Sequence, residues 1–237
     1  MLPLPDGALG MLSAFDRTAA RLVRVGLLLP WANVAVETEL GRLGLTNTVF
    51  HHARLVPASR TTAVDSSFWH GLRAASADAL NSLSHVPLDA AILACTSAGF
   101  SDGRPDLPSG VVTAFDALLA ALAALHVSRV VLATPYPTSV TEAESAALAK
   151  AGVEVLALAS LGLDDGYPDV TLDQVHGLLE QLPASAVRSA DAVVLSCTGW
   201  HTLPVVKEFE HRLGKPVLSS NLAMGLLAAR ISAGVAL

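Results

Sequence analysis

The sequence contains little charge, few cysteines and no long apolar run. Charged residues make up 15% of the 237 residues, and 15 basic against 21 acidic side chains give a formal net charge of −6. Because nucleic acids and anionic membranes bind clustered positive charge, the acidic balance and the scattered Lys and Arg argue against both partners. A membrane span requires an uninterrupted apolar run of about 18 to 20 residues, and we find none.

The start of the chain lacks the pattern of a secretory signal. It carries Asp6 and Asp16, and it has no basic start followed by an apolar block. We therefore expect a cytoplasmic protein. Only two cysteines are present, Cys95 and Cys197, and their number does not separate a disulfide from two free thiols. Reduced thiols are the default for a cytosolic protein of this size.

Motifs for metal or cofactor binding are also absent. The sequence has no His-Glu-x-x-His, Cys-x-x-Cys, phosphate-loop or Gly-x-Gly-x-x-Gly pattern. The pair His51 and His52 lies on a predicted strand, where neighbouring side chains face opposite ways, so it does not predict a metal site. We predict that the protein uses no metal and no organic cofactor.

Short β-branched runs alternate with longer Ala- and Leu-rich stretches along the chain. The short runs predict buried strands at 23–29, 47–56, 90–94, 129–133, 153–157, 192–196 and 216–219. The stretches between them predict helices at 63–83, 111–125, 139–150, 172–188, 203–213 and 222–231. Because the strands are apolar throughout, we expect sheets that are covered on both faces. The pattern predicts an α/β protein with mostly parallel sheets.

An internal repeat divides the chain into two halves. The segment DAAILACT at 89–96 recurs 102 residues later as DAVVLSCT at 191–198. A weaker pair has an offset of 105 residues, RVGLLLPW at 24–31 and RVVLATPY at 129–136. Two matching segments in the same order predict two similar lobes that face each other across a pseudo-twofold axis.

The repeat and the short connections set the expected domain limits. We assign the first α/β lobe to residues 21–115 and the second to residues 116–219. Residues 1–20 have no counterpart in the repeat and are expected to be an extension, either packed on the outside or mobile. Whether the last helix, 220–237, returns to the first lobe is left open. The apolar composition hints at a homodimer.

Polar residues follow the strands at equivalent places in the two halves. Cys95 ends a strand of the first half, and Cys197 ends the equivalent strand of the second. The polar and small residues that follow these two cysteines are Thr96, Ser97, Thr198 and Gly199. Ligands of parallel α/β sheets bind at the carboxyl ends of the strands, so both thiols are expected to approach one cleft from opposite sides.

Two thiols in one cleft suit chemistry on a small carboxylate. A thiolate is a strong nucleophile and a serviceable base, and its pKa falls near a helix N-terminus. Two thiols can exchange protons on opposite faces of one carbon, or act as nucleophile and proton donor across a double bond. The hydroxyls of Thr96, Ser97 and Thr198, with loop N–H groups, would hold the substrate carboxylates.

Structural roles for the cysteines are the alternatives. A cysteine at the end of a buried strand is ordinarily a small apolar filler. A disulfide between Cys95 and Cys197 is the other structural alternative, although cytosolic disulfides are rare. Their equivalent positions in the repeat, each followed by Thr, favour a shared catalytic role.

Several segments together resemble the aspartate/glutamate racemase superfamily. They are the two Cys-Thr strand ends, LPWANVAVETE at 29–39, LATPYPTSVTEAE at 132–144 and GKPVLSSN at 214–221. Within the superfamily the sequence is most similar to the maleate cis-trans isomerase branch. The resemblance covers roughly residues 23–232. It implies a cofactor-independent enzyme of two Rossmann-like lobes, with the active site in the cleft between them.

The resemblance also implies residue roles. Cys95 matches the cysteine that attacks the double bond of maleate to give a covalent succinyl adduct, and Cys197 matches the cysteine that supplies and later removes the proton. Rotation about the new single bond and loss of the thiolate would give fumarate. Asn33 and Tyr136 match the substrate-binding asparagine and tyrosine.

The sequence departs from the isomerase pattern near the expected site. The stretch at 162–167 carries Asp164 and Asp165 where the branch usually offers an asparagine. Added carboxylates would repel a dicarboxylate, unless they point away or the substrate is not maleate. Trp31 is bulkier than the serine common in the isomerases, and His201 follows the second thiol and could tune it. These roles stay open.

Three other functions remain as alternatives to maleate isomerisation: two enzyme activities and one binding function. Two thiols could racemise an amino acid or a hydantoin by proton transfer. A related decarboxylase acting on arylmalonates is less favoured, because those enzymes keep only the second-lobe cysteine and this chain has Cys95. The non-enzyme alternative is a carboxylate-binding protein that has kept the cleft and lost catalysis.

Overall fold

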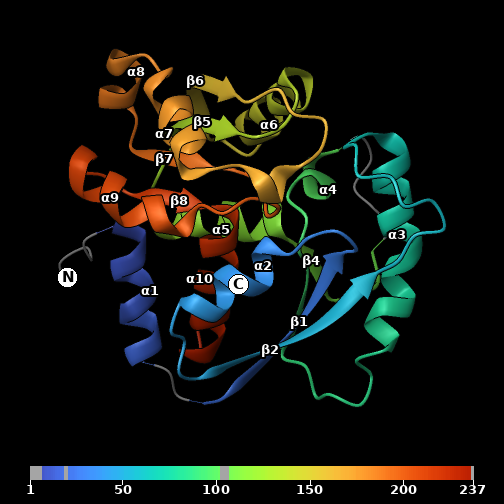
Figure 1. Ribbon diagram of the computed structural model, residues 1–237. Coiled ribbons are helices and arrows are strands. Elements are labelled where there is room, and N and C mark those ends of the chain that lie inside the picture. The colour runs from blue at the N-terminus through green and yellow to red at the C-terminus, as the bar shows by residue number, and fades with distance from the viewer. Residues whose placement is uncertain (1–6, 19–20, 102–106, 236–237) are drawn as a thin grey trace.

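The computed structural model describes residues 7–18, 21–101 and 107–235. Within these residues, two four-stranded sheets have the strand orders β2-β1-β3-β4 and β6-β5-β7-β8. The first sheet lies in the lower part of Figure 1 and the second in the upper part. The strands are β1 (Val23–Pro30), β2 (Thr48–Leu55), β3 (Ala90–Leu93), β4 (Val111–Thr113), β5 (Arg129–Thr134), β6 (Glu154–Ser160), β7 (Ala192–Leu195) and β8 (Val217–Ser219).

The two sheets have the same strand order: adding four to each strand number in the first sheet gives the order of the second. Every neighbouring pair of strands is parallel. This arrangement confirms the predicted α/β fold of two Rossmann-like lobes with parallel sheets. All seven predicted strands are present; β4 is an additional one.

The helices cover the sheets and differ from the prediction in five places. They are α1 (Gly7–Arg17), α2 (Ala35–Arg42), α3 (Ser66–Asn81), α4 (Ser97–Phe100), α5 (Ala114–Ala124), α6 (Thr138–Lys150), α7 (Leu172–Glu180), α8 (Ala184–Ser189), α9 (Leu203–Leu213) and α10 (Ser220–Ser232), with a 3-10 turn η1 (Tyr167–Asp169). The sequence analysis did not predict α1, α2 or α4. The segment 111–125 begins as strand β4, and the segment 172–188 is two helices.

Local chemistry explains two of these differences. Val111 and Val112 are β-branched and pair with β3. Thr113 then forms a capping box with Asp116, in which each side chain accepts the other residue's backbone N–H, and this starts α5. Pro183 stands at the N-cap of α8, where a missing N–H is tolerated, so it separates α7 from α8.

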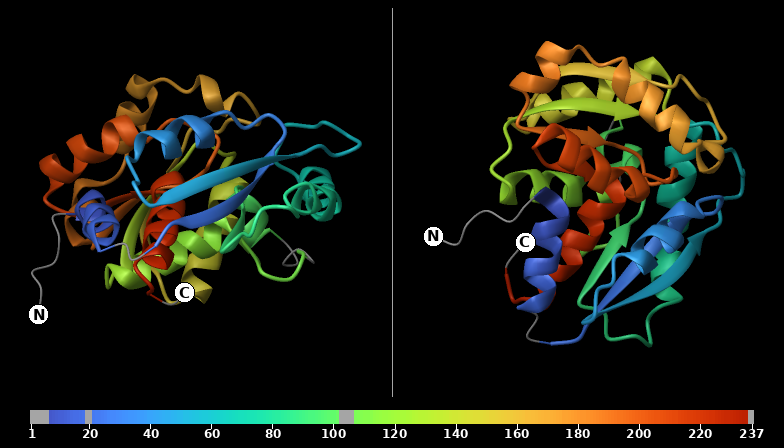
Figure 2. Two further views of the ribbon diagram at one scale, coloured as in Figure 1. Left: turned by 90° about the horizontal axis from the view of Figure 1, so that it is seen from below. Right: turned by 60° about the vertical axis from the view of Figure 1, so that its left-hand side comes forward.

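Helix α10 lies between the two sheets and contacts elements of both halves (Figure 2). It packs against α5, α1 and α2 and contacts β1 and β8. Helix α1 packs on α10 through Ala8, Met11 and Leu12, which are buried. Glu210 accepts the Ala8 N–H at 2.6 Å, so the start of α1 is fixed to α9.

The lobe limits expected from the sequence, 21–115 and 116–219, stay a prediction. Parts of the expected segments, residues 1–6, 19–20, 102–106 and 236–237, lie outside the described residues.

Equivalent aspartates tie the sheets at the ends remote from the ligand side. Asp89 accepts the backbone N–H of Arg24 at 2.8 Å, and Asp191 accepts that of Arg129 at 2.9 Å. The Arg129 guanidinium, with the backbone N–H groups of Ser128 and Arg129, lowers the pKa of Asp191 to about 2. No helix of the described residues is long and apolar enough to cross a membrane.

Candidate active site

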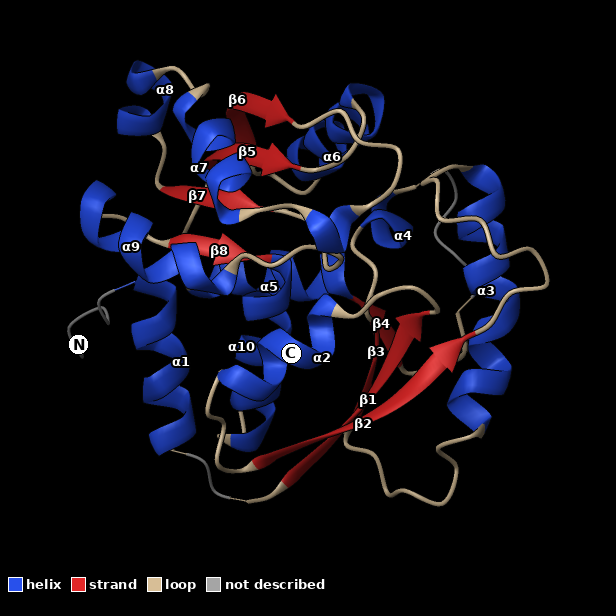
Figure 3. Cartoon of the chain, viewed as in Figure 1, coloured by secondary structure: helices blue, strands red, loops and turns tan. Residues whose placement is uncertain are grey.

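A cavity of about 540 Å³, partly open to solvent, lies where the carboxyl ends of strands from both sheets meet. The arrowheads of β1, β2, β5 and β6 point toward one side of the molecule in Figure 3. Loops after these strands and after β3 and β7 form the walls. The lining residues are Pro30, Trp31, Ala32, Asn33, Thr62, Val64, Phe68, Cys95, Ser97, Tyr136, Asp165, Tyr167, Pro168, Cys197, Thr198 and Gly199.

Cys95 follows β3 and lines this cavity from the first half. Its thiol lies 3.4 Å from the Ser97 hydroxyl, which also accepts a hydrogen bond from the Trp69 indole at 3.0 Å. Burial raises the pKa of Cys95, while the Ser97 hydroxyl and the N–H groups of Ser97 and Ala98 favour the thiolate. The thiol is therefore protonated at rest and has donors in place to stabilise the anion.

Cys197 follows β7 and lines the cavity from the second half. Its backbone has φ 125°, a conformation that costs free energy for a residue with a side chain. Its N–H donates to the Ser220 hydroxyl at 3.1 Å, while its sulfur accepts the Gly199 N–H at 3.2 Å. Burial raises the pKa of Cys197 to about 12, and hydrogen bonds from Tyr136 and Gly199 oppose that rise.

Both cysteines are free thiols, so the structure does not contain the alternative disulfide. The pKa of neither thiol is lowered, contrary to the effect expected near a helix N-terminus, because burial outweighs the local donors. A thiolate at either position must form when substrate or another group takes the proton.

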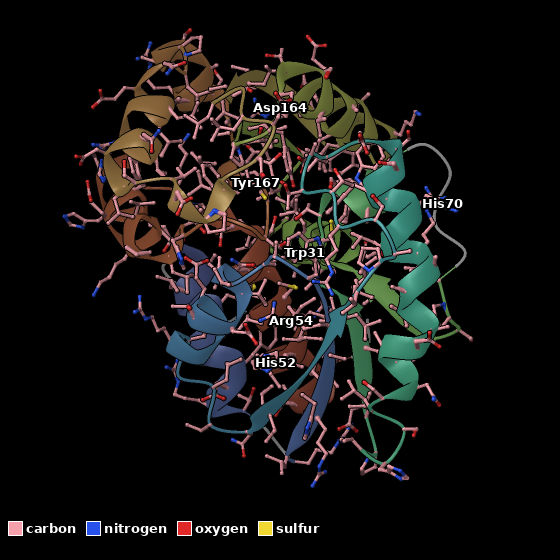
Figure 4. The ribbon with its side chains drawn as sticks, turned by 45° about the vertical axis from the view of Figure 1, so that its right-hand side comes forward. Trp31, His52, Arg54, His70, Asp164 and Tyr167 are labelled. Atoms are coloured by element: carbon pink, nitrogen blue, oxygen red, sulfur yellow. The ribbon has the colours of Figure 1, made fainter. Side chains whose placement is uncertain are left out.

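Asn33 and Thr198 join the two halves beside the cavity. The Asn33 side-chain N–H donates to the Thr198 hydroxyl at 3.1 Å, and its oxygen accepts the Val36 N–H at 3.2 Å. Thr198 donates in turn to the Ala94 carbonyl at 2.9 Å. The Arg54 guanidinium donates to the Asn33 carbonyl and pairs with Glu37. Figure 4 shows Arg54 below Trp31 on the first-half side. These bonds fix the orientation of the amide.

Thr96 is the one predicted site residue that does not line the cavity. It is fully buried, and its hydroxyl donates to Ser220 at 2.9 Å. Ser220 also accepts the Cys197 N–H, so Thr96 links the first strand end to the second through α10. The expected carboxylate contact from Thr96 is wrong, because its hydroxyl already points away from the cavity. Four other predicted binding or site residues line the cavity together: Ser97, Tyr136, Thr198 and Gly199.

Aromatic rings form one side of the cavity. Tyr136 and Tyr167 meet edge to face with ring centroids 5.7 Å apart, and burial raises the pKa of both phenols. Trp31 faces the cavity from the first half, and its indole N–H donates to the Thr61 carbonyl at 3.4 Å. The Arg60 guanidinium lies 6.0 Å from the Trp31 ring centroid. No Lys, Arg or His belongs to the described lining of this cavity.

Of the three polar residues whose roles the sequence left open, Asp165 lines the cavity and the other two do not. Asp165 lines the cavity and accepts a hydrogen bond from Thr62, which joins a loop of the first half to a loop of the second. Asp164 and His201 do not line it. Asp164 lies above Tyr167 in Figure 4, toward the outside of the second half. Within the described residues, no group of three or more His, Cys, Asp or Glu could hold a metal ion.

Sequence reasoning missed a pair of buried carboxylates. It assigned no role to Glu39 of α2 or Glu144 of α6, and both are buried. Helical spacing could have identified them, because Glu39 falls three residues after the buried Val36, and Glu144 falls three after the buried Thr141. It also missed Ser220, Trp69 and Tyr167.

The fold and the shared cavity define the class. Two equivalent parallel α/β lobes with the site between them are the fold of the aspartate/glutamate racemase-like superfamily. A family model described as arylmalonate decarboxylase matches residues 101–235. The chain belongs to this arylmalonate decarboxylase family, which is an enzyme family.

Named relatives include both decarboxylases and isomerases. The arylmalonate decarboxylase of Bordetella bronchiseptica is 37% identical over 121 residues, which cover 50% of this chain and 50% of that enzyme. The maleate isomerase of Pseudomonas putida is 25% identical over 229 residues, which cover 86% of this chain and 89% of that enzyme.

A solved structure is similar over nearly the whole chain. It is the maleate cis-trans isomerase of Nocardia farcinica, a cysteine-to-serine mutant with a covalently bound succinylcysteine intermediate. The two structures superpose with a TM-score of 0.78 at 25% identity, covering 90% of this chain and 94% of that one.

Proposed function

We propose that the protein catalyses the cis-trans isomerisation of maleate to fumarate, with Cys95 as nucleophile and Cys197 as proton donor and acceptor. One observation carries the proposal: the only two cysteines of the chain line one cavity from equivalent strand ends. The maleate isomerases among the relatives and the succinylcysteine described for the Nocardia enzyme support it. The reaction requires no cofactor.

The proposed reaction begins with transfer of the Cys95 proton to a carboxylate of the bound maleate, which returns it when the Cys95 thiolate leaves at the end. The thiolate forms a C–S bond to one alkene carbon, and the π electron pair takes the proton of Cys197 at the other carbon. The product is a succinyl thioether with a single bond where the double bond was. After rotation about that bond, Cys197 removes a proton from the same carbon, the double bond re-forms, and the Cys95 thiolate leaves.

Donors beside each thiol have defined tasks in this scheme. Ser97 and the Ala98 N–H stabilise the Cys95 thiolate, while Tyr136 and the Gly199 N–H stabilise that of Cys197. A substrate carboxylate would take a hydrogen bond from the Asn33 side-chain amide, which has two N–H donors and gives one to Thr198, and from the Ser97 hydroxyl once the Cys95 sulfur is bound to carbon. The closely packed aromatic wall excludes water from the adduct.

Replacement of each thiol tests the proposal. We expect Cys95→Ser and Cys197→Ser each to reduce maleate turnover by at least about a thousandfold, the range seen when a nucleophile or its proton partner is lost. Thermal unfolding of each variant should stay close to that of the wild type. Near wild-type formation of fumarate, followed by NMR, in either folded variant would contradict the mechanism.

Decarboxylation of an arylmalonate is the second candidate function. The family match, the 37% identity to the Bordetella enzyme and the aromatic cavity wall favour it. The two candidates separate by their dependence on Cys95. Decarboxylation by Cys197 alone predicts that Cys95→Ser still releases carbon dioxide, whereas isomerisation predicts that it is inactive on maleate.

A substrate panel in D2O distinguishes the remaining reaction types. Maleate isomerisation gives fumarate, decarboxylation gives an arylacetate with solvent deuterium, and racemisation of an amino acid or hydantoin exchanges the α-proton without other change. Thermal stabilisation by a carboxylate with no turnover of any compound would instead support the binding protein. A homodimer and a cytoplasmic location remain expectations from the sequence.

A further inference from the structure

Glu144 is a fully buried carboxyl group next to the candidate site with a single hydrogen bond. It lies on α6, and its Oε1 accepts the hydroxyl of Ser196. Its Oε2 is also buried and has no hydrogen-bond partner among the described residues. A buried carboxylate oxygen without a partner is costly, whereas a neutral acid in the same place is tolerated much better.

Glu144 lies close enough to the second thiol to influence it. Its hydrogen-bond partner Ser196 directly precedes Cys197 in the chain. A negative charge on Glu144 raises the pKa of Cys197 and also that of Tyr136, the phenol that donates to the Cys197 sulfur. Glu144, Tyr136 and Cys197 therefore form one electrostatically coupled cluster, of which Tyr136 and Cys197 line the cavity and Glu144 lies outside the lining.

Among the residues that the structure describes, none of the elements packed on α6 brings a cation to Glu144. Helix α6 packs against α4, β5 and β6. Helix α4 carries no titratable residue, and the charged residues Arg129 of β5 and Glu154 of β6 stand at the amino-terminal ends of their strands. Cys95 is the other titratable group of the cluster, and its thiolate also raises the pKa of Tyr136.

The ionisation of Glu144 falls in the physiological pH range. Burial raises its pKa to about 8, and the hydrogen bond from Ser196 offsets only part of that rise. At pH 7 the group is mostly the neutral acid. Above pH 8 it becomes an anion held by the residue that precedes Cys197, the thiol that must itself ionise during proton transfer.

We propose that Glu144 is a positioning residue for Cys197: as a neutral acid it holds Ser196 behind the second thiol, and as an anion it suppresses formation of the thiolate. Its charge thus sets the upper pH limit of proton transfer by Cys197. The effect on turnover rests on the proposed function, whereas the effect on the thiol itself does not.

The chain permits a direct measurement on one thiol. In Cys95→Ser, Cys197 is the only cysteine left, so its rate of alkylation by iodoacetamide reports its thiolate fraction. We compare this single-cysteine protein with and without Glu144→Gln from pH 6 to 10. Glutamine keeps the acceptor for Ser196 and carries no charge, so alkylation above pH 8 should rise about three- to tenfold, as a thiol pKa lowered by half a unit to one unit gives.

A matched control comes from the same helix. Glu142 is exposed and two residues away, and Glu142→Gln makes the same chemical change. It should leave the alkylation profile unchanged. Equal profiles with and without Glu144→Gln, in proteins with similar thermal unfolding, would overturn the proposal.

A second variant and a second readout keep the two proposals separate. If Glu144→Gln does not fold, Ser196→Ala removes the hydrogen bond from the other side, and it should alter the alkylation profile around pH 8. For maleate turnover, the alkaline decline of the wild type should move to higher pH in Glu144→Gln. Absence of any turnover in the wild type would contradict the proposed function, while the alkylation profiles would still decide the role of Glu144.

Discussion

The two halves place a glutamate at the same position and surround it differently. Glu39 and Glu144 are 105 residues apart, the offset of the repeat, and both are buried. Glu39 accepts the N–H groups of Thr202 and Leu203 at 2.5 and 2.7 Å and the side chain of Asn221 at 2.7 Å. Glu144 accepts one hydrogen bond, from Ser196.

One residue type thus has two roles: Glu39 is a structural link, whereas Glu144 has the electrostatic role proposed above. Glu39 extends from α2 of the first half to the start of α9 in the second, where the N-terminal N–H groups favour a negative charge. It therefore fastens the halves together behind the cavity. Glu144 makes no such cross-link among the described residues, and its surroundings favour the neutral acid.

The largest expected effect is on stability when Glu39 is changed. Glu39→Gln removes the charge and puts an amide N–H in place of Oε2, which accepts the side-chain N–H of Asn221, so two buried donors face each other. We expect a loss of about 3 to 5 kcal/mol in the free energy of unfolding, because several hydrogen bonds to a buried charged group are weakened together and each contributes about 1.5 to 3 kcal/mol. Glu144→Gln should lose far less at the same pH. Chemical denaturation of both variants measures the contrast, and equal losses would show that the two sites are alike.

The sequence predicted the repeated framework but not this asymmetry. Apolar runs and the repeated Cys-Thr segments were sufficient to place the strands, because these signals are local. The partners of Glu39 come from residues more than 160 positions away, a long-range pairing that local spacing does not specify. The same limit explains why the sequence did not predict that the Thr96 hydroxyl donates to the distant Ser220.

Identical Cys-Thr pairs have different backbones in the two halves. Cys197 has φ 125° and Cys95 does not have a positive φ, so the residues after them turn in different directions. Thr198 lines the cavity, whereas Thr96 donates to Ser220. Helices α2 and α4 were missed because they are short and neither has a side-chain N-cap hydrogen bond.

The second expected effect is a pH dependence of stability that belongs to Glu144. Its pKa rises from the usual 4.5 to about 8 on folding, so between these values the unfolded chain releases a proton that the folded protein keeps. Wild-type stability should therefore fall as pH rises through this window, by about 1.4 kcal/mol per pH unit, the slope for one proton.

Glu144→Gln removes this dependence because glutamine does not titrate. The Tm of the variant relative to the wild type should increase from pH 5 to pH 8 and then level off. Glu142→Gln, on the exposed face of the same helix, should show a constant difference. A constant difference for Glu144→Gln as well would mean that the buried carboxyl is ionised throughout.

The smallest expected effect concerns the loops that follow the equivalent strands β2 and β6. The first offers the neutral Thr62 to the cavity, and the second offers the exposed Asp165, to which Thr62 donates a hydrogen bond. A dicarboxylate entering here meets one negative charge with no lining cation. Asp165→Asn should lower KM for maleate about two- to fivefold, since an exposed charge contributes on the order of 1 kcal/mol.

The neighbouring residue supplies the control for this loop. Asp164 is exposed and does not line the cavity, so Asp164→Asn changes the net charge equally and should leave KM nearly unchanged. Added salt should shrink the Asp165→Asn effect, because it screens exposed charges. A higher KM in Asp165→Asn would reverse the interpretation: the carboxylate would then serve the cavity by holding Thr62 across the two halves, and repulsion of the substrate would be the lesser effect.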